Sequence, residues 1–87
     1  MRMITLDCRR LRTPDAGHAY LADALCLPPW YGRNLDALFD CLSEPMPPTL
    51  LVLEHCAQAS GSFAARARHV MRVAADRNDT LTLLERD

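Results

Sequence analysis

A continuous apolar run in the middle of the chain constrains the fold more than any other feature. Thr49-Leu50-Leu51-Val52-Leu53-Glu54 lacks the apolar–polar alternation of a half-buried strand, and such a run is typical of a parallel strand covered on both faces. Shorter runs rich in β-forming residues lie at 3–6 and 80–84. Helical patterns separate the three runs, and helical crossovers join parallel strands. We therefore expect an α/β fold whose three-stranded parallel sheet has the order 1-2-3, with the most apolar strand at its centre.

Capping residues and apolar periodicity predict two helices in the first half of the chain. Thr13-Pro14-Asp15 combines an N-cap, a proline suited to the first turn and an acid favoured by the helix dipole, which indicates a helix to about Leu25. Gly32 is interpreted as a residue that supplies a backbone angle other residues resist. Asn34 is a second N-cap, and apolar residues at helical spacing predict a helix over 34–43.

The second half of the chain contains a further helix and no domain boundary. Residues 63–77 carry an apolar stripe at helical spacing, and the small polar residues 57–62 indicate a turn or a short helix. Hydrophobic residues make up 49% of the 87 residues and charged residues 24%, values typical of a globular protein. We therefore expect one domain, 1–87, with three to four helices packed against the sheet.

Cysteine spacing and the N-terminal residues argue against several classes of protein. The four cysteines stand at 8, 26, 41 and 56 without a C-x-x-C pair, so we expect no metal or cofactor, and reduced, mostly buried thiols. No apolar run approaches the roughly 20 residues that span a bilayer. Residues 1–7 also lack the apolar segment of a signal peptide. We expect a cytoplasmic protein that is a monomer when free.

The net charge of −1 conceals an uneven distribution of charge. Residues 13–54 contain six acids and a single base, Arg33, whereas the rest of the chain contains five acids and nine bases, all arginine. If the acids gather on one face, that face attracts basic partners. If the two parts interleave in space, the field averages out. Four arginines cluster in the last predicted helix, but Asp76 interrupts them, and a pI of 6.3 disfavours nucleic-acid binding.

The predicted helix over 34–43 presents two carboxylates on its outer face. Asp36, Asp40 and Ser43 lie away from the apolar stripe that includes Phe39. Trp30-Tyr31 precede the helix, and carboxylates beside aromatic rings are suited to capture arginine or lysine from a partner. Other interpretations stay open at this point. The acids also suit a solvated helix face, Phe39 suits the core, and the two rings suit a lid over the core.

The segment around this helix is similar to a known protein family. Leu27-Pro28-Pro29-Trp30-Tyr31-Gly32-Arg33-Asn34-Leu35-Asp36-Ala37-Leu38-Phe39-Asp40-Cys41-Leu42 resembles the signature of the barstar family, intracellular inhibitors of the ribonuclease barnase. The similarity continues without gaps to the first strand, and 51–54 and 70–76 resemble the family's middle strand and last helix. The resemblance implies a three-stranded parallel sheet packed against helices. It also implies a protein that plugs a ribonuclease active site with helix 34–43 and the preceding loop.

The resemblance further implies roles for individual residues. Asp40 stands at the position of the family's main anion, which takes the place of an RNA phosphate. Asp36 stands at the position of a second acid that pairs with a basic residue, and Trp30 at that of an aromatic ring that packs on the catalytic histidine. The other partner-binding positions implied in this way are Phe39, Ser43, Glu44, Asp76 and Arg33.

Two other functions are compatible with these residues. Arg33 and Glu44 stand where the best-known family member has an acid and a glycine, so the fold could serve as an immunity protein against a different secreted nuclease. Asp36 and Asp40 could hold a metal or exchange protons in a small carboxylate-dependent enzyme. His55-Cys56 could supply a nucleophile, although neighbours on a strand point to opposite faces. We expect a ribonuclease inhibitor without catalytic activity, and without direct binding of nucleic acid or membrane.

Overall fold

Three parallel strands and three α-helices make up the computed structural model, which describes residues 1–59 and 61–87. The strands are β1 (Arg2–Asp7), β2 (Thr49–Glu54) and β3 (Leu81–Glu85). The helices are α1 (Pro14–Ala24), α2 (Leu35–Ser43) and α3 (Ser62–Arg77), with short 3₁₀ helices η1 (Cys8–Arg10) and η2 (Cys56–Gln58). The sheet order is β1-β2-β3 with both pairs parallel, so the predicted fold class is confirmed.

The two short 3₁₀ helices follow the ends of β1 and β2. No sequence pattern predicts η1. η2 accounts for part of the turn or short helix predicted over 57–62, although it begins at Cys56. Residue 60 of that predicted segment lies outside the described residues. His55 has a left-handed φ of 60°, which ends β2 and turns the chain into η2. The strand therefore does not continue through His55 and Cys56.

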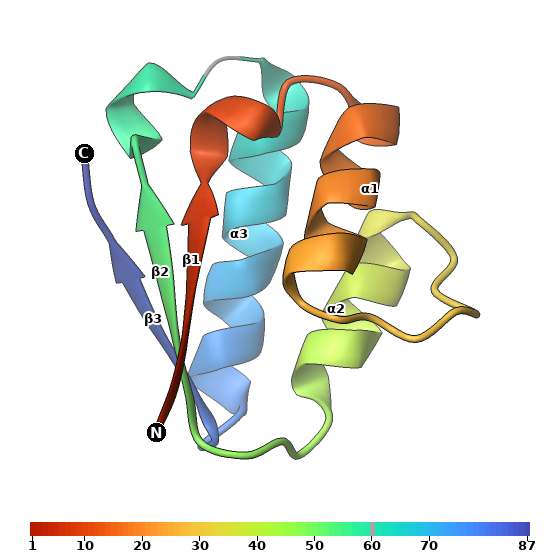
Figure 1. The fold of residues 1–87 in the computed structure, drawn as a ribbon, viewed down its shortest axis with the longest axis vertical. Helices are drawn as coiled ribbons and strands as arrows, with labels where there is room; N and C mark the ends of the chain where they lie inside the picture. Colours follow the sequence, from red (N-terminus) through yellow and green to blue (C-terminus); the bar gives the residue numbers. More distant parts are fainter. Residues whose placement is uncertain (60) are drawn as a thin grey trace.

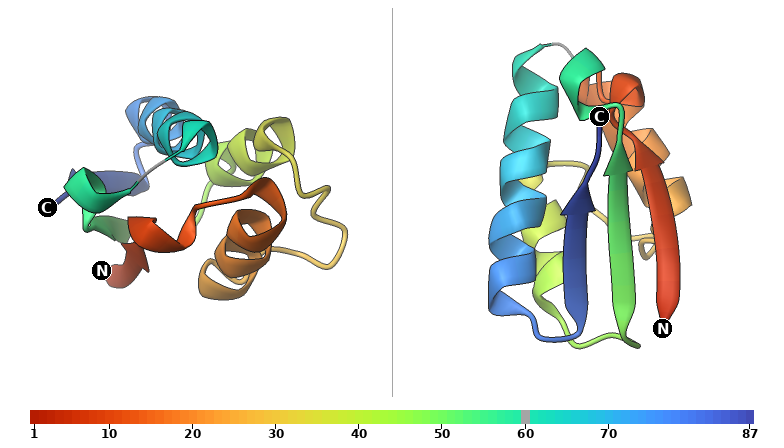
Figure 2. Two further views of the ribbon diagram at one scale, coloured as in Figure 1. Left: turned by 90° about the horizontal axis from the view of Figure 1, so that it is seen from above. Right: turned by 90° about the vertical axis from the view of Figure 1, so that its left-hand side faces the viewer.

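All three α-helices lie on one face of the sheet. Figure 1 shows the strands on the left and the helices on the right, and the right-hand view of Figure 2 looks onto the strands with the helices behind them. The prediction that the central strand is covered on both faces is therefore wrong. Val52 on the helix-free face is still only 4% exposed, because it lies in register between Thr5 and Leu84, whose side chains flank it.

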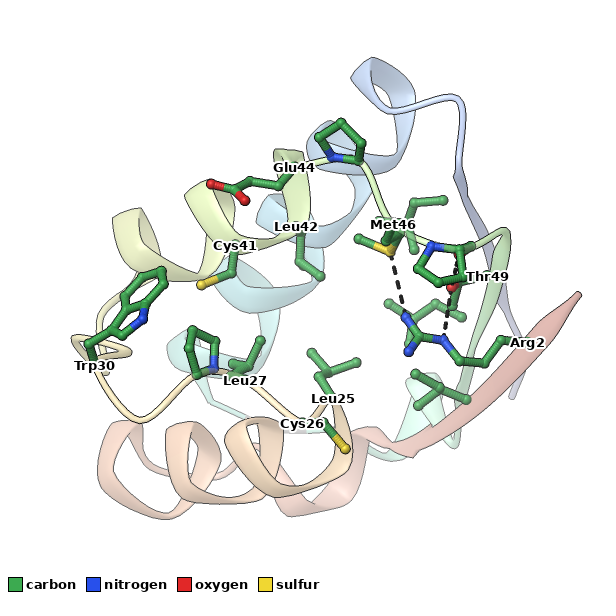
Figure 3. Close-up of a pocket in the computed structure, with 16 residues that line it drawn as sticks. Arg2, Leu25, Cys26, Leu27, Trp30, Cys41, Leu42, Glu44, Met46 and Thr49 are labelled. Atoms are coloured by element: carbon green, nitrogen blue, oxygen red, sulfur yellow. Dashed lines mark hydrogen bonds between the residues drawn. The ribbon is translucent and has the colours of Figure 1, made fainter.

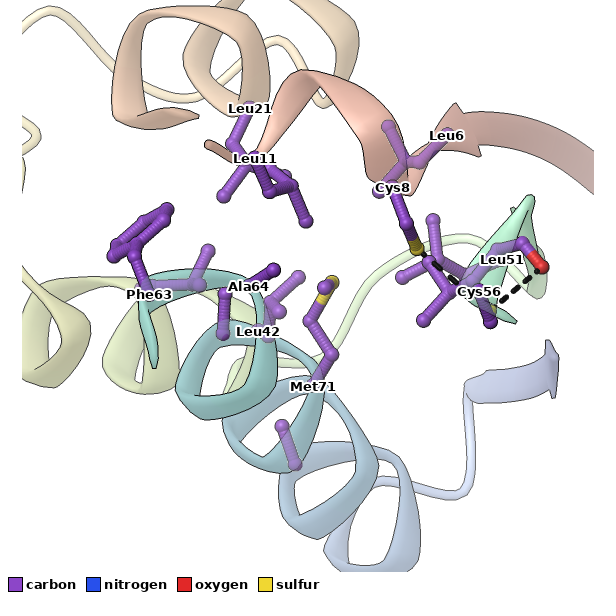
Figure 4. Packing of buried hydrophobic residues seen from close by; sticks show 14 of the residues in the cluster. Leu6, Cys8, Leu11, Leu21, Leu42, Leu51, Cys56, Phe63, Ala64 and Met71 are labelled. Carbon is purple, nitrogen blue, oxygen red and sulfur yellow. Dashed lines mark hydrogen bonds between the residues drawn. The ribbon is translucent and has the colours of Figure 1, made fainter. Parts of the chain in front are cut away.

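An apolar core joins α2 to the rest of the fold (Figure 4). Leu38 and Leu42 of α2 are 0% and 4% exposed and belong to the same cluster as Leu51 of β2 and Met71 of α3. Burying a leucine side chain stabilises a fold by about 1.5–3 kcal/mol. α2 packs mainly against α3 rather than against the sheet. The helix is thus held firmly along one side while its opposite side faces solvent.

The cysteines are all free, but they are not all buried. Cys8 and Cys56 are buried and Cys41 is half-buried, as expected. Cys26 is exposed, because it follows the end of α1 in a turn where its φ is 52°. The expectation of mostly buried thiols therefore does not extend to Cys26. Within residues 1–59 and 61–87, no helix has the length and apolar character needed to cross a bilayer.

Candidate protein-binding site

The first turn of α2 is set by its N-cap. The Asn34 carboxamide oxygen accepts a hydrogen bond from the Ala37 amide at 2.7 Å, and its side-chain nitrogen donates to the Gly32 carbonyl at 3.3 Å. The left-handed backbone angle occurs at Arg33, with φ 53°, and not at Gly32, so the expectation for Gly32 is wrong. A Cβ on Gly32 would stand 3.2 Å from the side-chain nitrogen Nδ2 of Asn34. The glycine therefore leaves space for the cap.

The last turn of α2 is held by a residue from the turn between α3 and β3. The side-chain nitrogen of Asn78 donates to the carbonyls of Leu42 at 2.8 Å and Glu44 at 2.9 Å. Its oxygen accepts from the amide and the hydroxyl of Thr80 at 3.0 and 2.6 Å. Terminal carbonyls of a helix lack partners within the helix, so Asn78 satisfies groups that burial would otherwise leave unpaired. α2 is thus fixed at both ends.

The outer side of α2 is acidic and unpaired. Asp36, Asp40, Ser43 and Glu44 are exposed. Among residues 1–59 and 61–87, neither Asp36 nor Asp40 has a cation within 4.0 Å or a side-chain hydrogen bond. The Ser43 hydroxyl donates to the Phe39 carbonyl at 2.7 Å, within the helix. Two carboxylates one turn apart are therefore presented to solvent on a rigid support.

The loop before α2 has one ring inside and one outside. Tyr31 is 7% exposed and its hydroxyl is hydrogen-bonded to Nδ1 of His18, which is itself 3% exposed. The His18 ring meets Phe63 edge-on at 4.9 Å between centroids. Tyr31 is therefore packed into the core, which leaves it little exposed surface for a partner. Trp30, next to this anchor, is 76% exposed and projects from the loop.

Burial around this anchor changes the proton affinity of both rings. Burial, with a smaller contribution from the positive charge of Arg33, lowers the pKa of His18, while Asp15 opposes the change. Burial raises the pKa of Tyr31 to about 12. Both groups are therefore neutral at physiological pH, and a neutral hydrogen-bonded pair anchors the loop that carries Trp30.

The acidic side chains alter the nearest thiol. Burial raises the pKa of Cys41, and the negative charges of Glu44 and Asp40 add to the effect. The direction of both charge effects indicates a negative field along this part of α2. A partner with converging cations suits such a field. Within the described part of the chain, no group of three or more histidine, cysteine, aspartate or glutamate side chains is placed to hold a metal ion.

The remaining predicted residues occupy different surroundings. Phe39 is half-buried against the core, and the guanidinium of Arg77 lies over its ring, 5.7 Å from the centroid. Asp76 is exposed and lines a cleft between α3 and β3 with Arg72, on a different element from the acidic side chains of α2. Arg33 is exposed at the start of α2. The fold therefore places Asp36, Asp40 and Ser43 on α2 and Asp76 on α3.

A groove of about 320 Å³ borders the acidic side of α2 (Figure 3). Its walls come from the second half of α2, the loop after α1 and the first residues of β1 and β2. Trp30 and Glu44 both line it. The lining is mostly apolar, so a partner that meets the carboxylates also finds apolar contact area beside them.

Sequence patterns did not reveal the partners of two residues that position this site. Asn78 stands between the last predicted helix and the last predicted strand, and nothing in its neighbourhood indicates that it reaches α2. His18 lies 13 residues from Tyr31, and no motif connects them. Polar side chains on elements next to a helix end are candidates for capping that end, but the packing of the elements decides which of them does so.

The fold and the site define a small α/β protein that carries a preformed acidic surface on one helix. The family model described as Barstar (barnase inhibitor) matches residues 1–86. The "Putative ribonuclease inhibitor YrdF" of Bacillus subtilis (strain 168) is 35% identical over 82 residues, covering 93% of this chain and 90% of the relative. The chain therefore belongs to the barstar family.

Proposed function

We propose that this protein inhibits a basic ribonuclease by placing the carboxylates of α2 in the enzyme's phosphate-binding site. The observation that carries the proposal is the pair Asp36 and Asp40, which are exposed one turn apart and, in the described residues, lack a cation of their own. The family of the chain and the name of its relative YrdF support the same function. The inhibitor acts inside the cell, and no catalytic role is assigned to it.

Phosphate mimicry is the physical basis of the inhibition. A ribonuclease holds RNA phosphates with converging cations, and Asp40 offers those cations an anion from the middle of a rigid helix. Asp36 pairs with a second basic residue. Because Asn34 and Asn78 already fix both ends of α2, little conformational entropy is lost when the carboxylates engage. Preorganisation of this kind raises affinity without requiring more contacts.

The other residues adjust the fit around the two carboxylates. Trp30 supplies a large exposed ring that covers part of the enzyme surface. Phe39 is held by the core and by Arg77, so it gives the interface a stiff apolar edge. The Ser43 hydroxyl donates its hydrogen bond within the helix, so this residue contributes to the interface through packing. Asp76 acts at the periphery.

A charge-matched pair of variants tests the proposal. Asp40→Ala should weaken inhibition of a barnase-type ribonuclease by about 2–5 kcal/mol or more, the general range for removing one partner of a buried charge pair. That is a loss of roughly 30- to 5,000-fold in affinity. Asp23→Ala changes an exposed residue of α1, makes the same change in net charge and should leave inhibition unchanged. Equal affinities for the two variants, measured by titration calorimetry and residual ribonuclease activity, would contradict the role of Asp40.

Two exposed residues favour a second candidate, an immunity protein against a different secreted nuclease. Arg33 adds a cation at the start of α2, and Glu44 adds a carboxylate at its end, beside the groove. Rim charges of this kind select among partners. Titration against a set of purified bacterial nuclease toxins separates the candidates. Inhibition of a DNA-cleaving toxin at concentrations that leave ribonucleases active would favour immunity.

A further inference from the structure

Two buried thiols meet where β1 and β2 end. Cys8 is 0% exposed and Cys56 is 6% exposed, and their Sγ atoms are 3.7 Å apart although the residues are 48 positions apart in the chain. Figure 4 shows the two side chains pointing toward each other at the edge of the apolar core. Neither residue belongs to α2 or to the loop before it. The proposed inhibitory site therefore makes no use of this pair.

The backbone holds both residues in place. β1 and β2 are paired in register up to Asp7 and Glu54, so both strands end at the same level of the sheet. Cys8 opens η1, and its carbonyl accepts from the Leu11 amide at 3.1 Å. Cys56 opens η2, and its amide donates to the Arg86 carbonyl at 3.0 Å. The contact between the thiols thus follows from the parallel register and is not a chance approach of two mobile loops.

The distance leaves a short step to a covalent bond. A disulfide has an S–S length of about 2.05 Å, so the two sulfur atoms must approach by less than 2 Å from their 3.7 Å separation. Rotation about the Cα–Cβ bonds and small shifts of the 3₁₀ helices supply movements of that size. In the reduced protein, Cys56 Sγ lies 3.4 Å from the Leu53 carbonyl, to which it donates, and this bond is lost on oxidation.

We propose that Cys8 and Cys56 are a site of reversible oxidation, forming an intramolecular disulfide between η1 and η2 when the protein meets a small-molecule disulfide such as oxidised glutathione. The cross-link joins residues that already touch and closes a long loop of chain. It therefore stabilises the folded protein and leaves the acidic side of α2 as it is. Reduced glutathione reverses the reaction, so the two forms report the redox state of the surroundings.

The reaction proceeds through two thiol–disulfide exchanges. Cys56 is the more accessible cysteine, since it is 6% exposed and Cys8 is 0% exposed. Its thiolate attacks one sulfur of oxidised glutathione, forms a mixed disulfide and releases one glutathione thiolate. The Cys8 thiolate then attacks Cys56 Sγ and releases the second. Two cysteine thiols lose two electrons and two protons, and one glutathione disulfide becomes two glutathione thiols.

The surroundings of the pair make the reaction slow and selective. Burial and the hydrogen bond with Cys56 raise the pKa of Cys8, so its reactive thiolate is scarce. The positive charge of Arg68 acts in the opposite direction. Arg68 stays near the pair because Glu85 binds it at 3.2 Å. A thiol of this kind reacts slowly with a reagent from solution, but readily with a neighbouring sulfur already held in contact with it.

The test uses a variant in which the other two thiols are removed, Cys26→Ser with Cys41→Ser. The native variant is incubated with oxidised glutathione and a trace of reduced glutathione. We expect a mass loss of two hydrogens, a peptide that links Cys8 to Cys56, and a midpoint of thermal unfolding at least about 10 °C above that of the reduced form. Adding Cys56→Ser should abolish all three changes.

The same variant in denaturant provides the comparison that decides the result. If the denatured chain forms the Cys8–Cys56 disulfide while the native protein keeps both thiols, the folded geometry does not support the reaction and the proposal fails. It also fails if the native disulfide forms but lowers the unfolding midpoint. Because the readouts are mass and stability, neither result depends on ribonuclease inhibition.

Discussion

Replacing Asn78 tests whether the turn after α3 holds the last turn of α2. Asn78→Ala removes two hydrogen bonds to the Leu42 and Glu44 carbonyls and two from Thr80. The Leu42 carbonyl is buried and cannot turn to water, and an unsatisfied buried group costs about 1–3 kcal/mol. The more accessible bonds add less, so we expect a loss of about 2–4 kcal/mol in the free energy of unfolding. For a domain of this size that lowers the thermal midpoint by roughly 10–25 °C.

Urea unfolding followed by circular dichroism measures the effect, with two further variants for comparison. Asp79→Ala changes the exposed neighbour of Asn78 and should stay within about 0.5 kcal/mol of the wild type. Asn78→Asp keeps an acceptor for Thr80 but sets a carboxylate against two carbonyl oxygens, so it should destabilise at least as much as alanine. The reasoning is refuted if Asn78→Ala unfolds at the same urea concentration as Asp79→Ala.

Three further changes test the anchor of the loop and the charge at the start of α2. Because the folded-state pKa of His18 is lowered, the free energy of unfolding should be constant above pH ~6.5 and fall as the pH drops below that value. His18→Gln should flatten this slope between about pH 7 and 5, and parallel slopes for the two proteins in urea titrations would contradict the role of His18. Gly17→Ala places a methyl group on the Phe63 ring and should cost about 1–3 kcal/mol, so an unchanged melting curve would show that the ring moves aside. Arg33→Gly relieves a left-handed φ of 53° and removes a cation three residues before Asp36. The association rate with a basic ribonuclease, measured by stopped flow, should therefore rise at low salt only. A rate increase that persists at high salt would exclude an electrostatic cause.

Local signals were sufficient for most of the fold. Thr13 and Asn34 were predicted as N-caps, and both accept the expected backbone amides. The apolar run at β2 was placed at the centre of the sheet, and it pairs with β1 and β3. These predictions hold because capping and periodicity act within a few residues, where sequence and geometry are directly coupled.

The expectations that failed depend on packing between distant segments. Both faces of β2 were expected to be covered, yet the helices lie on one face, since a run of apolar residues does not specify which neighbours bury it. Tyr31 and Trp30 are adjacent and similar in character, but only Tyr31 is buried, where its hydroxyl is hydrogen-bonded to His18 of α1. The left-handed angle was expected at Gly32 and occurs at Arg33, the residue before the N-cap of α2.

The sequence by itself determined the order of the elements, the parallel sheet and the outward face of α2 that carries Asp36 and Asp40, because periodicity and capping are local. Only the tertiary structure decided that Asn78 secures the last turn of α2, that Trp30 is the exposed ring, and that Cys8 meets Cys56. Each of these contacts joins residues distant in the chain or depends on one that does. Their distances follow from the register of the strands and the packing of the helices, which no short segment encodes.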